Sequence, residues 1–197
     1  MEGPPGARGR PILVAVDGGG GAGKSALVAA LAGSGAAGAV AVVAVDDFHR
    51  PSWEVMAGRS IAAGVGEAID WRRLAREVLE PLRGGHRPRY RRYDWTADAP
   101  GEWAEVESAG VVVVEGVYAA RPELAGVYDR RVWVDCPRDV RLARVLARDG
   151  AGSREWWEAE WLPAEDRYVA LAPWRWMDAV VDGRRDPSEG YRLLLAG

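Results

Sequence analysis

The segment from Gly18 to Ser25 constrains the fold of this chain more than any other feature. It reads GGGGAGKS and matches the pattern G-x-x-x-x-G-K-[ST]. The apolar run Ile12–Val16 precedes it and the helical pattern Lys24–Leu31 follows it, so we expect a loop between a strand and a helix. Glycines let successive backbone N–H groups turn toward one anion, and the helix adds its positive N-terminal end. The segment therefore predicts a phosphate-binding loop in an α/β fold.

Four more apolar runs rich in valine predict further buried strands. They alternate with helical patterns, an order typical of a parallel sheet with helices on both faces. We therefore predict a three-layer α/β fold, the P-loop NTPase fold, with a five-stranded parallel sheet. The additional strands are Ala39–Val45, Val111–Val114, Val132–Val134 and Ala179–Val181. The additional helices are Trp71–Arg83 with Asp70 as its cap, Pro137–Arg148 and about 155–171, and Ser188–Leu195 is expected to close the fold.

The chain is expected to form one domain. A chain of 197 residues can bury roughly 70% of the surface that it exposes when unfolded. We assign residues 1–10, rich in Gly, Pro and Arg, to a flexible N-terminal segment and residues 11–197 to a single P-loop domain. Residues 49–66 and 84–103 show no clear period and are expected to be irregular, and such long segments are often functional.

The composition excludes several classes of protein. Cys136 is the only cysteine, which excludes an intramolecular disulfide and a multi-cysteine zinc site. No apolar run has the length of a membrane span or of a signal peptide, so no membrane partner is expected and the default location is cytoplasmic. The net charge of -3 argues against nucleic acid as a partner. The sequence leaves open whether the chain forms a homodimer.

The loop residues predict the cofactors ATP and Mg²⁺. Lys24 is the only lysine among 26 basic residues, which indicates that arginine cannot replace it there. Lys24 should reach the β- and γ-phosphates, and the Ser25 hydroxyl should bind Mg²⁺. Because the chain has no asparagine and no second lysine, a GTPase that reads guanine with Asn-Lys-x-Asp is excluded. The expected nucleotide-binding residues are Gly18, Gly19, Gly20, Gly21, Ala22, Gly23, Lys24, Ser25 and Ala26.

Acidic residues follow two of the predicted strands. Asp46 and Asp47 end the second strand and Glu115 ends the third, which places them at the sheet edge where open α/β folds bind ligands. A carboxylate near the terminal phosphate can accept the proton of a substrate hydroxyl, and we predict this role for Asp46. Glu115 is a candidate Mg²⁺ ligand with Ser25, and Asp46 is another. The alternative is that these acids only begin turns or end strands.

The order of these elements resembles the uridine kinase and phosphoribulokinase group, in particular its bacterial uridine kinase-like members. The resemblance covers most of the chain and continues through Asp46–Arg50, Tyr93–Trp95, Glu115–Tyr118, Arg141–Arg144 and Arg148–Asp149. It implies a kinase that transfers the γ-phosphoryl group of ATP to a hydroxyl of a nucleoside or nucleoside-like molecule. It further implies that Asp46 is the general base, that Ser25 and Glu115 hold Mg²⁺, and that Tyr93 lies beside the acceptor. Arginines around Arg148 are implied to form a lid, about residues 149–160, that excludes water.

Several departures from the group's pattern concern the acceptor. Gly64 stands where uridine kinases carry the aspartate that holds the ribose hydroxyls, His49 replaces a tyrosine, and Asp98 stands about where a base-contacting histidine is expected. No asparagine or glutamine is present to read uracil. A modified nucleoside, a sugar-like metabolite or a natural product therefore fits as well as uridine. The alternative of a different class is an ATP-hydrolysing switch or a nucleic-acid-binding ATPase.

Arginines and aromatic residues supply the remaining candidates. Arg144 and Arg148 precede the break at 150–153 and are predicted, with Lys24 and Asp46, to act in catalysis, with Arg154 as a weaker third arginine and Arg138 on a solvated face. Residues 87–95 are interpreted as a hairpin over the substrate. Tyr93 and Trp95 would stack on the acceptor or simply pack there, beside Glu115 and Asp46. His49 is either a substrate contact or a surface residue. Four tryptophans are expected in the core rather than against ligand: Trp133, Trp156, Trp161 and Trp174.

Overall fold

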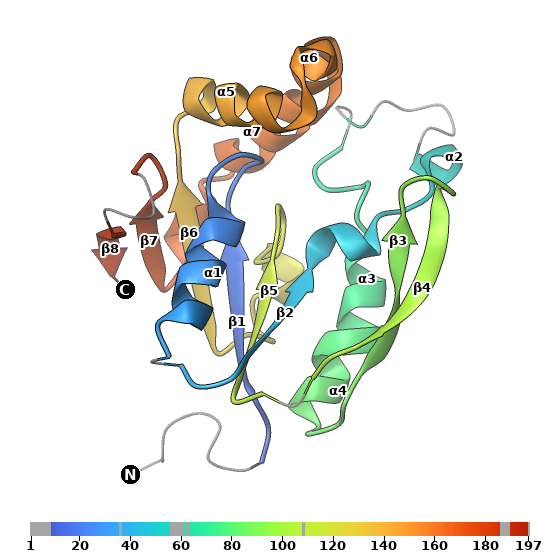
Figure 1. The fold of residues 1–197 in the computed structure, drawn as a ribbon, viewed down its shortest axis with the longest axis vertical. Helices are drawn as coiled ribbons and strands as arrows, with labels where there is room; N and C mark the ends of the chain where they lie inside the picture. Colours follow the sequence, from blue (N-terminus) through green and yellow to red (C-terminus); the bar gives the residue numbers. More distant parts are fainter. Residues whose placement is uncertain are drawn as a thin grey trace.

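The computed structural model describes residues 9–35, 37–55, 61, 64–107, 109–185 and 190–196. Its centre is a six-stranded sheet in the order β2-β5-β1-β6-β7-β8 (Figure 1). The first five strands in this order are parallel, and β8 pairs antiparallel with β7. The strands are β1 (Ile12–Asp17), β2 (Val40–Ala44), β5 (Val111–Glu115), β6 (Arg130–Asp135), β7 (Ala179–Asp182) and β8 (Arg192–Ala196). The five predicted parallel strands are confirmed, and the described part of the closing segment 188–195 lies in the sixth strand.

Both faces of the central strands β1 and β5 are largely buried, as a parallel sheet requires. On β1, Leu13 and Ala15 belong to one hydrophobic cluster, whereas Val16 belongs to a second cluster with Leu27 and Val28 of α1 (Lys24–Gly33). The alternation follows from the period of two along a strand. Continuous runs of valine therefore suit these strands, because successive side chains meet helices on opposite faces.

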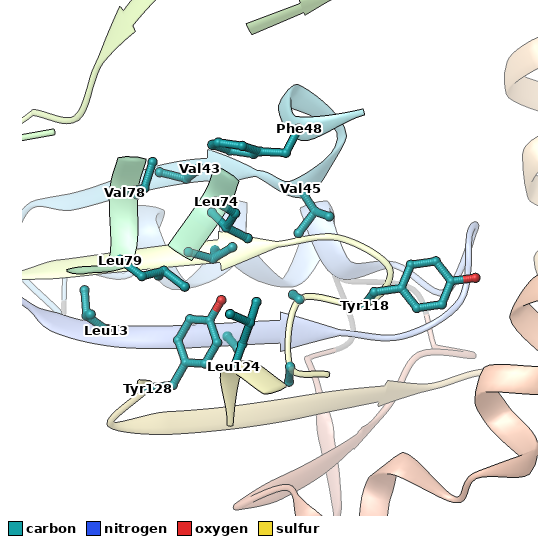
Figure 2. Close-up of a cluster of buried hydrophobic side chains, with 14 of the residues drawn as sticks. Leu13, Val43, Val45, Phe48, Leu74, Val78, Leu79, Tyr118, Leu124 and Tyr128 are labelled. Carbon is teal, nitrogen blue, oxygen red and sulfur yellow. The ribbon is translucent and has the colours of Figure 1, made fainter. Parts of the chain in front are cut away.

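The helix on the first face runs without a break from 71 to 83. It consists of α3 (Trp71–Leu74), a π-helical turn (Ala75–Leu79) and α4 (Glu80–Arg83). Figure 2 shows its apolar side, with Leu74, Val78 and Leu79, packed over β1 and β2. The predicted cap is confirmed, because the Asp70 carboxylate accepts a hydrogen bond from the Arg73 N–H at 3.0 Å.

The segment 84–103 is not irregular, contrary to the expectation. It contains β3 (Arg89–Asp94) and continues into β4 (Ala99–Glu105), and the two strands form a separate antiparallel hairpin. A register shift between Arg91 and Tyr93 interrupts the pairing, so Tyr90 and Tyr93 are buried three positions apart rather than two or four. This bulge removes the period of two by which a strand is recognised. The interpretation of residues 87–95 as part of a hairpin is confirmed.

Three helices lie across the carboxyl ends of the parallel strands (Figure 1). They are α5 (Arg138–Asp149), α6 (Arg154–Trp156) and α7 (Leu162–Ala170), and a π-helical turn (Trp157–Trp161) joins the last two. The short α2 (Ser52–Val55) lies near the tip of the hairpin. None of the helices in the described ranges is long and apolar enough to cross a membrane. Of the predicted N-terminal segment only Gly9 and Arg10 are described, and Arg10 pairs with Asp129 at 2.8 Å.

Candidate active site

The glycine loop connects β1 to α1, as predicted. Gly21 and Gly23 have φ values of 76° and 101°, a region that side chains rarely adopt. A Cβ on Gly21 would also lie 2.5 Å from the backbone oxygen of Arg141 in α5. Gly21 therefore requires glycine for both reasons and Gly23 for its backbone conformation, and the loop can pass beneath α5 and present its N–H groups at the start of α1.

Lys24 is buried at the first turn of α1. Its Nζ donates hydrogen bonds to the backbone oxygens of Gly18 at 2.9 Å and of Gly19 at 3.0 Å. The ammonium group therefore lies across the loop rather than extending to the surface. A compact ammonium with three donors can hold two carbonyls and still face an anion.

Asp17, which the sequence analysis missed, anchors the beginning of the loop. Its fully buried carboxylate accepts hydrogen bonds from the N–H groups of Gly18, Tyr118 and Ala120, at 2.7, 3.0 and 2.8 Å, and from the Tyr168 hydroxyl at 2.7 Å. Burial raises the pKa of Asp17 to about 6, and the hydrogen bonds and Lys24 oppose that rise. This one side chain joins β1 to the segment after β5 and to α7.

A second buried group on the loop is the ion pair between Arg141 of α5 and Glu165 of α7. The Arg141 Nη1 lies 2.5 Å from the Glu165 carboxylate, and the side chains are 5% and 2% exposed. Burial raises the pKa of Glu165, and the Arg141 and Lys24 charges oppose that rise. Both oxygens of Glu165 lie 3.0 Å from the Gly20 N–H. Unlike Arg138, Arg141 is not on a solvated face of α5, because Glu165 of α7 covers it.

A cavity of about 570 Å³ opens above the loop and contains many of the predicted site residues. This volume is typical of a site for a small molecule or cofactor. The predicted residues that line it are Gly20, Gly21, Gly23, Lys24, Ser25, Ala26, Asp46, Trp95, Glu115, Arg144 and Arg148. The strand ends of β1, β2 and β5 and the arginines of α5 therefore meet at one hollow, as the sequence predicts for the carboxyl edge of the sheet.

The oxygen atoms of Ser25 and Glu115, which line the cavity, suit a magnesium ion. The Ser25 hydroxyl donates a hydrogen bond to the Glu115 carboxylate at 3.1 Å, and both residues line the cavity with Asp46. Among the described residues, no group of three or more His, Cys, Asp or Glu side chains is placed to hold a metal by itself. Magnesium is typically held by one or two carboxylates with phosphate and water completing the shell, so Ser25 and Glu115 fit this ion.

The neighbouring carboxylates Asp46 and Asp47 have different surroundings. Asp46 lines the cavity. The carboxylate of Asp47 instead accepts a hydrogen bond from the Tyr90 hydroxyl at 2.9 Å and lies 3.7 Å from Arg92, on the side of the hairpin. Burial raises the pKa of Asp47. Of the two acids, Asp46 is therefore the one that can meet a ligand.

The arginines of α5 differ in how they are held. The Arg144 guanidinium donates to the backbone oxygens of Gly183 at 2.7 Å and of Gly21 at 3.3 Å, which fixes it beside the loop. Arg148 is exposed, pairs with Asp149 at 2.6 Å, and extends into the same cavity. Arg138 pairs with Asp166 at the surface, which confirms its expected place on a solvated face.

Aromatic rings line part of the cavity. Trp95 lines the cavity, and its ring lies 4.8 Å from that of His49 and 5.0 Å from that of Tyr93, between centroids. His49 is therefore buried rather than on the surface. Its Nδ1 lies 2.8 Å from the backbone oxygen of Arg50, which only accepts, so the proton is on Nδ1 and Nε2 is an acceptor. Within the described part of the chain, His49 Nε2 and Trp161 Nε1 are buried without a partner.

The tryptophans are less buried than expected. Trp133 lies in the core, as predicted, but Trp156 and Trp161 line the cavity and Trp174 is partly exposed. For Trp156 and Trp161 the reason is the π-helical turn at 157–161, which changes the direction in which successive side chains point. The expectation rested on how often tryptophan is buried and took no account of this turn.

The two departures at Gly64 and Asp98 also have a structural account. A Cβ on Gly64 would lie 2.3 Å from the carboxyl carbon of Glu67, so the Glu67 side chain fills the space that an aspartate would need. Asp98 accepts hydrogen bonds from the Ser52 hydroxyl at 2.5 Å, from the hydroxyl of Tyr93 and from the Ser52 N–H at 2.8 Å. Asp98 thus joins the hairpin turn to α2, and these hydrogen bonds lower its pKa.

Comparisons with known proteins agree with this geometry. The model of the "Phosphoribulokinase / Uridine kinase family" matches residues 13–154. Uridine kinase of Deinococcus deserti is 30% identical over 144 residues, which cover 71% of this chain and 69% of that protein. A Bacillus stearothermophilus protein described as a uridine kinase candidate superposes with a TM-score of 0.68 at 20% identity, over 91% of this chain and 90% of the other. A fructose transport system kinase candidate from Silicibacter superposes with a TM-score of 0.67 at 25% identity, over 84% and 87% of the two chains.

Proposed function

Because this chain belongs to the phosphoribulokinase / uridine kinase family and is a P-loop phosphotransferase that acts on a hydroxyl group, we propose that it uses ATP and Mg²⁺ to phosphorylate a small nucleoside-like molecule. The observation that carries this proposal is the single cavity that joins the phosphate loop, Asp46 and Trp95. A triphosphate bound on the loop and an acceptor against the aromatic side would meet at Asp46.

Each group at the cavity has a proposed part in the transfer. Ser25 and Glu115 would hold Mg²⁺, which supplies positive charge to the phosphate oxygens when bound. Lys24 and Arg144, which are fixed against the loop by their hydrogen bonds to its carbonyls, would stabilise the charge of the transferring group. Asp46 would accept the proton of the attacking hydroxyl, a role that requires a free carboxylate within hydrogen-bond reach.

The segment 149–160 is proposed as a lid. It contains Trp156 and Trp157, which line the cavity together with Arg148 just before the segment. Closing aromatic side chains over the reaction excludes water, so the phosphoryl group is transferred to the bound hydroxyl rather than hydrolysed. Arginines such as Arg148 in this position can accelerate phosphoryl transfer by about 10³-fold or more.

The aromatic side of the cavity supports an acceptor with a flat or apolar part. Trp95, Trp156 and Trp161 line the cavity, and a base or other ring could stack on them. The lone acceptor atom of the buried His49, Nε2, could receive a hydrogen bond from an O–H or N–H group. The Glu67 side chain in the space beside Gly64 favours a second candidate, a sugar-like metabolite whose hydroxyls are held differently from those of ribose.

Substituting the two neighbouring aspartates tests the proposal. In a screen of nucleosides and sugars with Mg·ATP, we expect phosphorylation of at least one compound, and we expect Asp46→Asn to lower kcat about 10²- to 10⁴-fold, the usual contribution of a general base. Asp47→Asn, whose carboxylate faces Tyr90 and Arg92, is the matched control and should keep most of the activity. ATP binding, measured by calorimetry, should change little in either variant.

Two results would contradict this function. Equal activity of wild type and Asp46→Asn would remove Asp46 from the mechanism. Steady release of phosphate without any acceptor, stimulated by a polynucleotide or a protein, would favour the alternative of an ATP-hydrolysing switch.

A further inference from the structure

We infer that the buried Arg141–Glu165 pair is a positioning device for the phosphate loop: Glu165 holds the Gly20 N–H group, and Arg141 packs on the neighbouring glycines. The inference rests on the proposed binding of a triphosphate to this loop. It assigns a function to two residues on separate helices that lie far from the loop in sequence.

The loop needs an external restraint because it contains four consecutive glycines, Gly18 to Gly21. Glycine loses more backbone freedom on ordering than any other residue, and it has no side chain that could make stabilising contacts. An ordered anion site requires the N–H groups of such a loop to point in fixed directions before the ligand arrives. Lys24 restrains the carbonyls of Gly18 and Gly19 from within the loop, and the further restraint on the Gly20 N–H group comes from Glu165, outside the loop.

Three glycines of the loop are in close contact with the elements above them. A Cβ on Gly19 would lie 2.0 Å from Arg141 Nη1, and one on Gly21 would lie 2.5 Å from the Arg141 backbone oxygen. A Cβ on Gly20 would lie 2.9 Å from a Glu165 carboxylate oxygen and 3.0 Å from the Trp157 ring. Any side chain at these positions would displace its neighbours, so the glycines serve this close packing as well as the turn.

The hydrogen bond from the Gly20 N–H to Glu165 orients the backbone of the loop. Both carboxylate oxygens of Glu165 lie 3.0 Å from the Gly20 nitrogen, which fixes the orientation of the peptide between Gly19 and Gly20. Arg141 lies 2.5 Å from the same carboxylate, holds it in place and favours its charged form against the effect of burial. A charged acceptor makes a stronger hydrogen bond to an N–H group than a neutral one does.

The same two helices provide a comparison pair that does not touch the loop. Arg138 of α5 lies 3.0 Å from Asp166 of α7, and these side chains are 49% and 43% exposed. Asp166 also lies 3.7 Å from Arg141 Nη2, so the substitution used as control is at Arg138 rather than at Asp166. An exposed pair of this kind contributes little to stability. If the only purpose of Arg141 and Glu165 were to join α5 to α7, burial beneath the helices and contact with three glycines would not be needed.

The experiment compares Glu165→Gln, Glu165→Ala and the control Arg138→Gln with the wild-type protein. Amide hydrogen exchange of the peptide that contains Gly20 and calorimetric titration with Mg·ATP are measured for each. For Glu165→Ala we expect faster exchange at Gly20 and about 10- to 100-fold weaker binding of the triphosphate, the range for one lost charge-assisted hydrogen bond. Glu165→Gln, whose amide oxygen can still accept from Gly20, should show a smaller loss, and Arg138→Gln should behave as wild type.

The outcomes separate this inference from the proposed function. If wild-type protein gives no heat with Mg·ATP, the proposed function fails. If wild type binds and both Glu165 variants bind equally well with unchanged exchange at Gly20, the inference fails although the function stands. Tighter binding in Glu165→Gln would also overturn it, because the carboxylate would then compete with phosphate. Should Glu165→Ala not fold, Glu165→Gln and the exchange at Gly20 decide the question.

Discussion

Asp17→Asn tests how the charge of the buried carboxylate at the start of the phosphate loop affects the free energy of unfolding. In the folded protein burial raises the pKa of Asp17 to about 6, against an ordinary value of 3.8. Ionising Asp17 therefore costs the native state about 3 kcal/mol at pH 7. Because the folded-state pKa is the higher one, the stabilisation from the protonated form is fully present below pH 3.8 and is lost as the pH rises through about 6.

Asparagine keeps the shape of the side chain but cannot ionise. Its oxygen can still accept from the N–H groups of Gly18 and Tyr118, and the Tyr168 hydroxyl can rotate to accept from the new NH₂ group. The Ala120 N–H, which now donates to the second carboxylate oxygen at 2.8 Å, would face another donor. One buried N–H group without a partner costs about 1–3 kcal/mol.

These two effects predict a pH-dependent difference between the proteins. At pH 4.5 the variant should be less stable than wild type by up to about 1–3 kcal/mol, and this deficit should shrink by about 2 kcal/mol at pH 7. The measurement is urea unfolding followed by tryptophan fluorescence at both pH values. The other carboxylates titrate in both proteins, so their contributions cancel in the difference. A difference in stability that does not change with pH would refute the reasoning.

Two further predictions concern ligand binding. Lys24→Ala should weaken Mg·ATP binding, measured by calorimetry, at least about tenfold without unfolding the protein. Lys24→Arg should not restore binding, because a guanidinium is planar and larger than an ammonium. Full binding by Lys24→Arg would contradict the inference that arginine cannot replace this lone lysine. Trp95→Ala should raise KM for the acceptor about 3- to 10-fold and leave KM for ATP unchanged, because one ring contact is lost. Trp103→Ala is its matched control, since both rings are similarly exposed, at 58% and 59%, and Trp103 lies on the other strand of the hairpin under Arg89. Equal effects of the two substitutions would exclude a specific contact by Trp95.

The elements that local sequence determines could be predicted. The five parallel strands, the glycine loop and the helices at 71–83 and 138–149 each depend on a continuous pattern, either a run of valines, a motif or a helical period. The convergence of Ser25, Asp46 and Glu115 on one cavity followed from general topology, because the carboxyl ends of parallel strands share one edge of the sheet.

The remaining features of the fold and the site depend on contacts that no local sequence pattern predicts. The hairpin strand β3 carries a bulge that removes its alternation, and the π-helical turn at 157–161 turns two tryptophans toward the cavity. In the sequence, Arg141 is one of several arginines at helical spacing in α5. Only the position of α7 shows that it is buried against Glu165. A possible signal was available in Glu165, since an acid inside an apolar helical pattern needs a buried partner.

The support of the phosphate loop lies partly outside the region by which the family is recognised. The family model ends at residue 154, yet two side chains of α7, Glu165 and Tyr168, bind the Gly20 N–H and the Asp17 carboxylate. The residues that they contact, Asp17 and Gly20, are three positions apart at the start of the loop. Glu165 and Tyr168 are also three positions apart and lie on the same face of one helix. A motif that binds phosphate is therefore not an independent unit in this protein. Its geometry depends on where the C-terminal helices pack, and substitutions in α7 should act on the nucleotide even though they lie about 140 residues from the motif.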